Sequence, residues 1–261
     1  SEDDSSPPII NHMGNHTAFS GQNAFINAIM RDDLTSSAAF QSLVDGGDEY
    51  FRVVYGEDMD NKETALNANT IAADYYQFSI ASAFVDGLSG STFQYYLEAS
   101  DGAGNESFFC ENPSATSAAH CDAAPFTVTV TAAGGRTVSG TVSQSGTGVA
   151  SAKIIPGGFA IDIAVANGSG VYALAGMPNN TYVDIIGYKP GTCEMSIGAP
   201  IGTVDVANIN LALLPGDFGF YGGGAEEAFV TVLSSRPPEY GMVAVDIPAL
   251  LMRLTQPLDP A

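Results

Sequence analysis

The sequence predicts an all-β protein made of two tandem β-sandwich domains and a C-terminal strand-forming extension. Apolar and polar residues alternate with period two, most cleanly over residues 126–131. Turn-forming pairs such as Asp101-Gly102 separate these short runs. The charge also changes sharply near residue 133. Residues 1–132 hold 19 acidic and 3 basic groups, whereas residues 133–214 hold 4 and 3, which indicates a domain boundary.

Composition excludes several classes of partner. The 261 residues include 8 Lys+Arg against 29 Asp+Glu, a formal net charge of −21, with 45% hydrophobic residues. That apolar fraction is too high for a disordered acidic tail. So few basic residues cannot form the positive surface that binds nucleic acid or an anionic membrane. No run of 18 apolar residues occurs, so we expect no transmembrane helix.

The elements follow in order along the chain. Residues 1–8 form a polar lead that ends in Pro7-Pro8, and this start is typical of a mature end left after signal removal, so we expect export. Weak helical periodicity favours short helices at 34–44 and 64–73. The strand-like runs are 50–55, 75–80, 93–99, 126–131, 138–142, 171–174, 182–186, 209–213, 229–233 and 242–247.

Small residues between Thr131 and Arg136 form a flexible joint between two strand-like runs. We therefore expect a flexible lead at 1–8, an acidic sandwich at 9–132, a second sandwich at 133–214 and an extension at 215–261. The two strand-like runs of the extension are too few to fold alone, so they must pack on a sandwich of the same chain or of a neighbour.

Residues 9–131 resemble a bacterial immunoglobulin/fibronectin type III-like surface module. The resemblance rests on Ile9-Ile10-Asn11-His12, on the run from Phe25 to Asp33, and above all on residues 93–105, FQYYLEASDGAGN. Residues 136–214 look like a carboxypeptidase regulatory-like domain, a transthyretin-like sandwich. Here the matching segments are residues 138–142, 148–154, 167–178 and 187–191. Both resemblances imply non-catalytic spacer, adhesive or accessory modules.

Three cysteines are present, at positions 110, 121 and 193. Cys110 and Cys121 bracket a loop-like stretch of small polar residues, and a disulfide closing it would contribute roughly 3 kcal/mol. Two reduced buried thiols are the alternative. Cys193 is left over, either buried and inert or paired with another chain.

The immunoglobulin-like resemblance places the loop after the second strand and the loop before the last strand at the same pole. These loops carry Asp32-Asp33 and Asp101, followed by Asn105. Converging oxygen ligands suit calcium, so we hypothesise a low-affinity calcium site there, with residues 57–61 as a second possibility. The alternative is that these Asp and Asn residues cap their own turns.

No nucleophile elbow, zinc-protease motif or phosphate-binding glycine loop occurs, and the chain has no Trp. We therefore expect no enzymatic activity. The prediction is an extracellular or cell-surface structural protein that self-associates as a surface or filament subunit. In this hypothesis residues 226–251 add a strand to a neighbour's sheet through Phe229, Val230, Val232, Val243, Val245 and Ile247. The alternative is a monomeric adhesive or spacer module that binds glycan or protein at the cell surface or is attached to a secreted enzyme.

Overall fold

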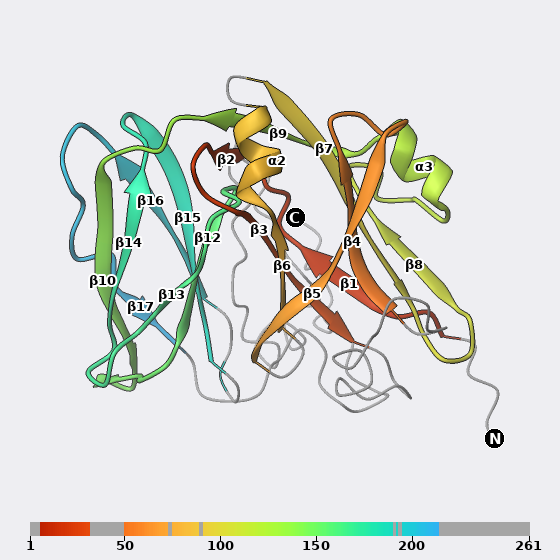
Figure 1. Cartoon of the computed structure of the whole chain (residues 1–261). Helices are drawn as coiled ribbons and strands as arrows, with labels where there is room; N and C mark the ends of the chain where they lie inside the picture. The colour runs from red at the N-terminus through yellow and green to blue at the C-terminus, as the bar shows by residue number, and fades with distance from the viewer. Residues whose placement is uncertain are drawn as a thin grey trace, which may run out of the picture.

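The computed structural model describes residues 6–31, 50–72, 75–88, 91–189, 192 and 195–213. Two β-sandwiches stand side by side in this part of the chain, and their sheet layers follow one another across the molecule (Figure 1). One nine-stranded sheet forms both layers of the first sandwich, and two four-stranded sheets form the second. The elements of the first sandwich are β1 (Ile9–His12), β2 (Thr17–Phe19), β3 (Ala24–Arg31), β4 (Tyr50–Gly56), β5 (Lys62–Ala72), β6 (Tyr75–Ile80), α2 (Ser82–Gly87), β7 (Thr92–Ser100), β8 (Glu106–Phe109), α3 (Ala118–Ala123) and β9 (Phe126–Thr131).

The first sandwich has the strand order β1-β3-β6-β5 in its inner sheet and β5-β4-β7-β9-β2 in its outer sheet. Strand β5 belongs to both, because its first half pairs with β4 and its second half with β6. Strand β2 runs parallel to β9, while the other pairs within these sheets are antiparallel. This switching of an early strand to the last strand is an arrangement of immunoglobulin-like sandwiches.

The helix expected at 64–73 is wrong, because Lys62–Ala72 forms strand β5. The segment is rich in Ala and other residues that tolerate helices, which produced the weak periodicity. Its pairing with β4 and β6 overrides that propensity, and register shifts against β6 bend the strand between the two sheets. The helix expected at 34–44 lies outside the described residues.

The core of the first sandwich is strongly aromatic. Phe51 makes edge contacts with Tyr76 and with Phe78, at centroid distances of 5.2 and 4.9 Å. Such edge-to-face pairs add stabilisation beyond the apolar area that they bury. The other buried aromatic side chains of this core are Tyr55, Phe93, Tyr95, Tyr96 and Phe126.

The second sandwich consists of two four-stranded sheets. Its outer sheet contains β11 (Thr147–Gly148), β10 (Arg136–Gln144), β14 (Val171–Met177) and β17 (Leu211–Ala212), and its inner sheet has the order β13 (Ala164–Val165), β12 (Lys153–Gly157), β15 (Thr181–Tyr188) and β16 (Met195–Ile201). The core between them is mostly aliphatic, with Val138, Val142, Ile154, Leu174, Val183, Ile185, Ile201, Leu211 and Leu213 among its members.

Residues 205–213 lie along one edge of β10 as an irregular parallel partner. The N–H of Ser139 donates to Val206 O at 2.8 Å, and the N–H of Ile209 donates to Ser139 O at 3.1 Å. A Cβ on Gly140 would lie 1.8 Å from Ile209 O, so this close approach requires glycine. The expected strands at 50–55, 75–80, 93–99, 126–131, 138–142, 171–174 and 182–186 are confirmed, and only the end of 209–213 is regular strand.

Candidate functional site: the interface between the sandwiches

The inner sheet of the first sandwich is buried on both faces. Along β3, Ile26 and Met30 point into the first core, whereas Ile29 between them joins a separate apolar cluster. Along β6, Phe78 belongs to the first core and Tyr75 to the separate cluster. Since successive side chains on a strand point to opposite faces, this sheet has apolar side chains on both of its sides.

The inner sheet of the second sandwich repeats this arrangement. Ile154 on β12 belongs to the second core, and its neighbour Ile155 joins the separate cluster. On β15, Ile185 points into the second core, while Ile186 and Tyr188 point to the separate cluster. The separate cluster therefore lies between the two sandwiches and consists of Ile29, Tyr75, Ile155, Ile186 and Tyr188, with Met13 and Ile163 packed against it. We call it the interface cluster.

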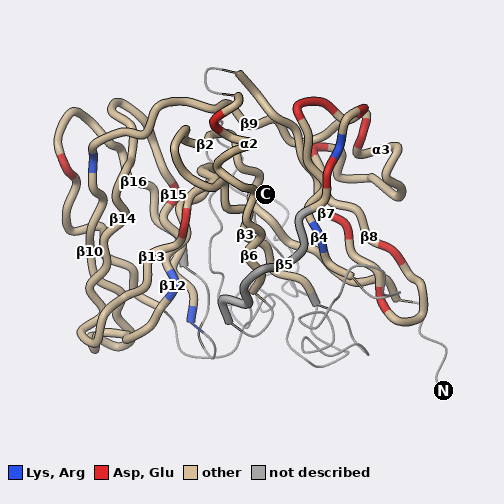
Figure 2. The backbone as a smooth tube through the Cα atoms, viewed as in Figure 1, with Lys and Arg blue, Asp and Glu red and all other residues tan. Residues whose placement is uncertain are grey.

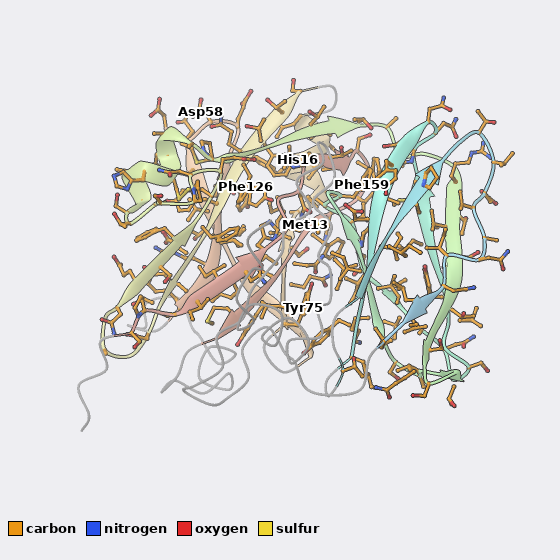
Figure 3. All side chains as sticks on the ribbon, turned by 180° about the vertical axis from the view of Figure 1, so that it is seen from behind. Met13, His16, Asp58, Tyr75, Phe126 and Phe159 are labelled. Carbon is orange, nitrogen blue, oxygen red and sulfur yellow. A yellow bond between two sulfur atoms is a disulfide. The ribbon has the colours of Figure 1, made fainter. Side chains whose placement is uncertain are left out.

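Tyr75 and Tyr188 form the aromatic contact of the interface cluster, with ring centroids 5.1 Å apart. Figure 3 shows Tyr75 and Met13 between the two sandwiches. A Cβ added to Gly157 would lie 2.4 Å from Met13 Sδ, so the Met13 side chain lies directly against the backbone of the second sandwich at this point. At the edge of the cluster, Gln77 Nε2 donates a hydrogen bond to Asp162 Oδ1 at 3.0 Å, which links the two sandwiches through polar side chains as well.

Backbone hydrogen bonds also cross between the sandwiches. The N–H of His16 donates to Gly158 O at 2.8 Å, and the N–H of Ala160 donates to Thr17 O at 2.8 Å. A third bond runs from Phe25 N–H to Ala160 O at 3.0 Å. Thr17 and Phe159 form a parallel bridge, so the second sandwich continues the edge of the first at this point.

The cores exchange residues at the same bridge. Phe19, on β2 of the first sandwich, packs in the second core and stacks on Phe159 with a centroid distance of 6.1 Å. Ala160, from the second sandwich, packs in the first core and is fully buried. Each core is therefore completed by a side chain of the other sandwich, and the two sandwiches pack as one body.

Sequence reasoning missed this interface. The signal that could have indicated it is a strand with apolar residues on both faces, which an exposed sheet does not need. Residues 24–30 and the pairs Ile154-Ile155 and Ile185-Ile186 show it. Over so short a run, a strand buried on both faces has the same pattern as a strand buried on one face that carries an exposed apolar residue. The sequence also does not show which distant strand covers the second face.

A buried hydrogen-bond network lies at the C-terminal end of β1, around His12. His12 Nδ1 donates to Asn27 O at 2.7 Å, because a carbonyl oxygen can only accept. Its Nε2 therefore accepts the hydroxyl proton of Tyr95 at 2.8 Å, and Tyr95 Oη accepts the N–H of Asn15 at 2.7 Å. Burial lowers the pKa of His12 to about 4, despite its hydrogen bond to Asn27, so His12 is neutral in the folded protein at pH 7.

The expected disulfide joins Cys110 and Cys121, with a Cα–Cα distance of 5.5 Å. It closes the segment between β8 and β9, both of which pair with the same edge of β7. Helix α3 lies in this segment, and its Asp122 receives hydrogen bonds from Lys62 Nζ at 2.6 and 2.7 Å. The disulfide-closed segment is thereby fixed to β5. Cys193 lies outside the described residues.

Of the residues expected to bind calcium, the structure describes Asp101 and Asn105. The carboxylate of Asp101 is fully buried, and its Oδ1 accepts the N–H groups of Ala103 and Asn105 at 2.9 and 2.8 Å. Its Oδ2 accepts Asn105 Nδ2 at 2.7 Å. Both carboxylate oxygens of Asp101 therefore accept hydrogen bonds from within their own turn. Asp32 and Asp33 lie outside the described residues, so the calcium site stays a prediction.

The second acidic segment, residues 57–61, forms the turn between β4 and β5. Asp58 Oδ1 accepts the N–H groups of Asp60 and Asn61, at 3.0 and 2.9 Å. In the described ranges, no three His, Cys, Asp or Glu side chains gather where they could hold a metal ion. Figure 2 shows most of the described acidic residues along the first sandwich, with few charges on the second.

The residues expected to mediate self-association, Phe229, Val230, Val232, Val243, Val245 and Ile247, lie outside the described residues, as does the whole predicted extension, residues 215–261. Within the described part of the chain, no helix is both long and apolar enough to cross a membrane.

No protein-family model and no curated protein matches the sequence. Among solved structures, the chain is similar to the N-terminal Ig1-2 module of a Drosophila receptor protein tyrosine phosphatase, with 14% identity over 77% of this chain and 100% of that chain and a TM-score of 0.32. It is also similar to the major pilin subunit of Bacillus cereus, with 13% identity over 80% of this chain and 70% of that chain and a TM-score of 0.25. A third similar structure contains fibronectin(III)-like modules of Clostridium thermocellum, with 11% identity over 75% of this chain and 94% of that chain and a TM-score of 0.24.

Likenesses this weak carry no argument about partner or activity. The fold class instead follows from the sheets themselves. The described chain is all-β apart from short helices, and its first sandwich is immunoglobulin-like in strand order. The resemblance of residues 136–214 to a carboxypeptidase regulatory-like domain stays a prediction.

Proposed function

We propose that this protein is a non-catalytic structural subunit of an extracellular or cell-surface assembly. In this proposal the two sandwiches act as one rigid body, and residues 226–251 join copies by adding a strand to a neighbour. The observation that carries the proposal is the interface between the sandwiches. The interface cluster, the exchanged Phe19 and Ala160 and the crossing hydrogen bonds hold the two modules in one orientation.

A fixed orientation is what a repeating assembly needs. Copies joined head to tail form a regular ring or filament only if every copy presents its contact surfaces at the same angle. Modules connected by a free linker such as residues 132–135 would otherwise sample many angles. The interface removes that freedom, because burial of Ile186 at 2% exposure leaves no room for the sandwiches to rotate without exposing apolar surface.

The disulfide supports the extracellular part of the proposal. Disulfides persist in oxidising compartments such as the bacterial periplasm and the cell exterior, and they are rare in the cytosol. The bond between Cys110 and Cys121 closes a segment whose helix α3 has only six residues, too few to be stable by itself in water. The segment thus depends on a bond that export makes possible.

The test is the assembly state of the full chain and of a tail variant, Val230→Pro with Val232→Pro. Proline removes the N–H groups that an added strand would donate, so the tail variant should be monomeric by light scattering while the parent assembles. Electron microscopy of the parent then distinguishes rings from filaments.

A parent that stays monomeric at all concentrations contradicts the proposal and favours the monomeric adhesive or spacer module. Leu254→Ala is the matched control, since this residue lies in the extension but beyond residues 226–251. It should assemble like the parent.

A further inference from the structure

The described sheets end in several edges, and most of them are closed or irregular. The edge of β2 is bonded to the second sandwich through the bridge from Thr17 to Phe159. Strand β16 contains Pro200 and Gly198, both of which weaken pairing with a further strand. Residues 205–213 bond to β10 irregularly, through side chains as well as backbone groups, because Asp205 Oδ1 accepts Thr137 N–H and Asn210 Oδ1 accepts Thr141 N–H.

Strand β14 is different. It ends the strand order β11-β10-β14, so within the described ranges its outer edge has no neighbouring strand. It is seven residues long, and its burial alternates regularly from exposed Val171 to buried Leu174. It carries no charged residue and no proline, the two features by which edge strands usually resist further pairing.

The hydrogen bonds of β10 show which groups β14 leaves unused. Ser139 and Thr137 bond to residues 205–213 on the far side, whereas Val142 N–H donates to Gly170 O on the β14 side at 2.8 Å. In an antiparallel pair the bonding residues alternate, so Val138 and Gly140 bond to β14, and Ser139 does not. Ala173, which lies opposite Ser139, therefore turns its N–H and C=O away from β10. The corresponding groups of Val171 already bond to Asn167, because Val171 N–H donates to Asn167 Oδ1 at 3.0 Å and Val171 O accepts the Asn167 N–H at 2.9 Å. Beyond Leu174 the register with β10 shifts, so the strict alternation ends there.

We propose that the outer edge of β14, through the backbone of Ala173, is the acceptor for residues 229–233 of a second copy of this chain. This inference rests on the proposed function and names its acceptor. The sequence 229–233, FVTVL, has the alternation of a strand and is as free of charge as β14 itself. A strand that pairs there extends the outer sheet of the second sandwich by one member.

The position of the extension favours a second copy over the same one. The described chain ends at Leu213, whose N–H donates to Ser143 O at 2.7 Å, at the same end of the sheet as Val171, the first residue of β14. A tail of the same copy that crosses this end would meet β14 at its first residue and run parallel to it. A tail from another copy is free to run antiparallel, which is the more stable pairing.

Charge also permits this contact. Residues 133–214 have 4 acidic and 3 basic groups, a net of −1, whereas residues 1–132 have a net of −16. The β10–β14 sheet forms the outer layer of the second sandwich, on the side away from the acidic first sandwich (Figure 1). Two copies can therefore meet at β14 with little electrostatic repulsion.

The experiment compares the parent with an edge variant, Ala173→Pro. The Ala173 N–H points away from β10, so proline removes the outward donor and leaves the β10 pairing in place. We expect association at least tenfold weaker than in the parent by sedimentation velocity, at an unchanged circular dichroism spectrum. Ala173→Lys places a charge at the same exposed position, where it opposes a further strand without changing the backbone. It should also weaken association, and it serves if the proline variant does not fold.

The matched control is Ile197→Pro, on the edge of β16. The N–H of Asn180 donates to Gly202 O at 3.2 Å, so residues of β16 with even numbers bond to β15 and Ile197 N–H points outward. The substitution removes the same kind of donor from a different edge. Association equal to that of the parent is expected.

A mixing experiment decides whose tail occupies the edge. The edge variant keeps an intact tail, and the tail variant, Val230→Pro with Val232→Pro, keeps an intact β14. Each alone should be monomeric, and an equimolar mixture should form a one-to-one dimer that grows no further. A mixture that stays monomeric overturns the proposal, because it means that each tail acts only within its own copy.

Two further outcomes separate this inference from the proposed function. If the edge variant assembles like the parent while the tail variant does not, then β14 is not the acceptor and the proposed function stands. If the parent itself does not assemble, the proposed function fails and the acceptor assignment fails with it.

Discussion

The two sandwiches differ in the side chains of their cores and in their net charge. The first has an aromatic core and carries a net charge of −16 over residues 1–132, whereas the second has a mostly aliphatic core and a net of −1 over residues 133–214. Both nevertheless have an inner sheet that is apolar on its two faces. The comparison teaches that two modules of very different charge and core composition can still be joined through apolar side chains at matching faces, with a polar contact between Gln77 and Asp162 beside them.

The largest effect is expected when a charge is introduced into the interface cluster. Ile186→Asp puts a carboxylate at a position that is 2% exposed, where an unpaired charge should cost about 4 kcal/mol. The sandwiches should then uncouple. Differential scanning calorimetry should show two unfolding transitions in place of the single transition expected for the parent.

The control for this change is Val204→Asp, the same kind of substitution in the second sandwich at a position that is 67% exposed. It should keep one transition at nearly the parent temperature. If Ile186→Asp also unfolds in one unshifted transition, the sandwiches are not coupled through the interface cluster.

A slightly smaller effect is expected from acid, through His12 of the first sandwich. Its pKa is about 4 in the folded protein and 6.5 in the unfolded chain, so the unfolded state takes up a proton first as the pH falls. The free energy of unfolding should be constant above about pH 7 and should decrease below pH 6.5, with a total loss of about 3 kcal/mol below pH 4.

The contribution of His12 is isolated by comparing urea unfolding of the parent and His12→Gln at pH 7.5 and 4.5. Glutamine can both donate and accept a hydrogen bond but does not titrate. The free energy of unfolding of His12→Gln should therefore decrease less than that of the parent between pH 7.5 and pH 4.5. Thr127→Gln, at an exposed position of β9, is the control and should keep the full dependence of the parent. Equal slopes for parent and His12→Gln would mean that this network does not couple to folding.

The disulfide gives the next effect. Replacing Cys110 and Cys121 together by alanine removes a cross-link over a separation of 11 residues, which should lower the free energy of unfolding by about 2.8 kcal/mol. The loss belongs to the first sandwich alone. In the Ile186→Asp background, where the transitions separate, only the transition of the first sandwich should move.

The smallest expected effect is that of calcium. If Asp32 and Asp33 complete a site with the turn at Asp101, calcium at ten times its Kd should add about 1.4 kcal/mol and raise the Tm by about 2–4 °C. Asp32→Asn with Asp33→Asn should abolish this shift, and Asp58→Asn should leave it unchanged. A Tm equal in chelator and in millimolar calcium would remove the hypothesis.

Much of the fold could be predicted from the sequence because period-two alternation is a local signal. Residues 126–131 show it without interruption, and they form β9. Residues 64–73 do not, because their pairing changes from β4 to β6 and their side-chain pattern changes with it. The disulfide was predictable from two cysteines around a short loop, since no other pairing closes so small a segment.

The interface could not be predicted for a different reason. Ile155 and Ile186 become interface residues only because Ile29 and Tyr75, at least 80 positions earlier, occupy the opposite face. No local period encodes such a match. Likewise the Asp101 turn shows from sequence only that oxygen ligands are close together, whereas the structure shows them bonded to their own backbone.

The exchange of Phe19 and Ala160 has a consequence for the order of folding. Thr17 and Phe159, which form the bridge beside these two residues, are 142 positions apart. A first sandwich that emerges from synthesis alone lacks the side chain that completes its core, and Phe19 has no second core to enter. Contacts at such sequence separation form late, because loop closure precedes any gain from them.

Until the second sandwich has been synthesised, the growing chain exposes Phe19, Ile29 and Tyr75 on its surface. These are the groups that bind chaperones or aggregate. A chain that ends in the joint between the sandwiches should therefore be soluble only poorly, although its own sheets are complete. The boundary that the charge pattern marks in the sequence is not the boundary at which the chain becomes able to fold.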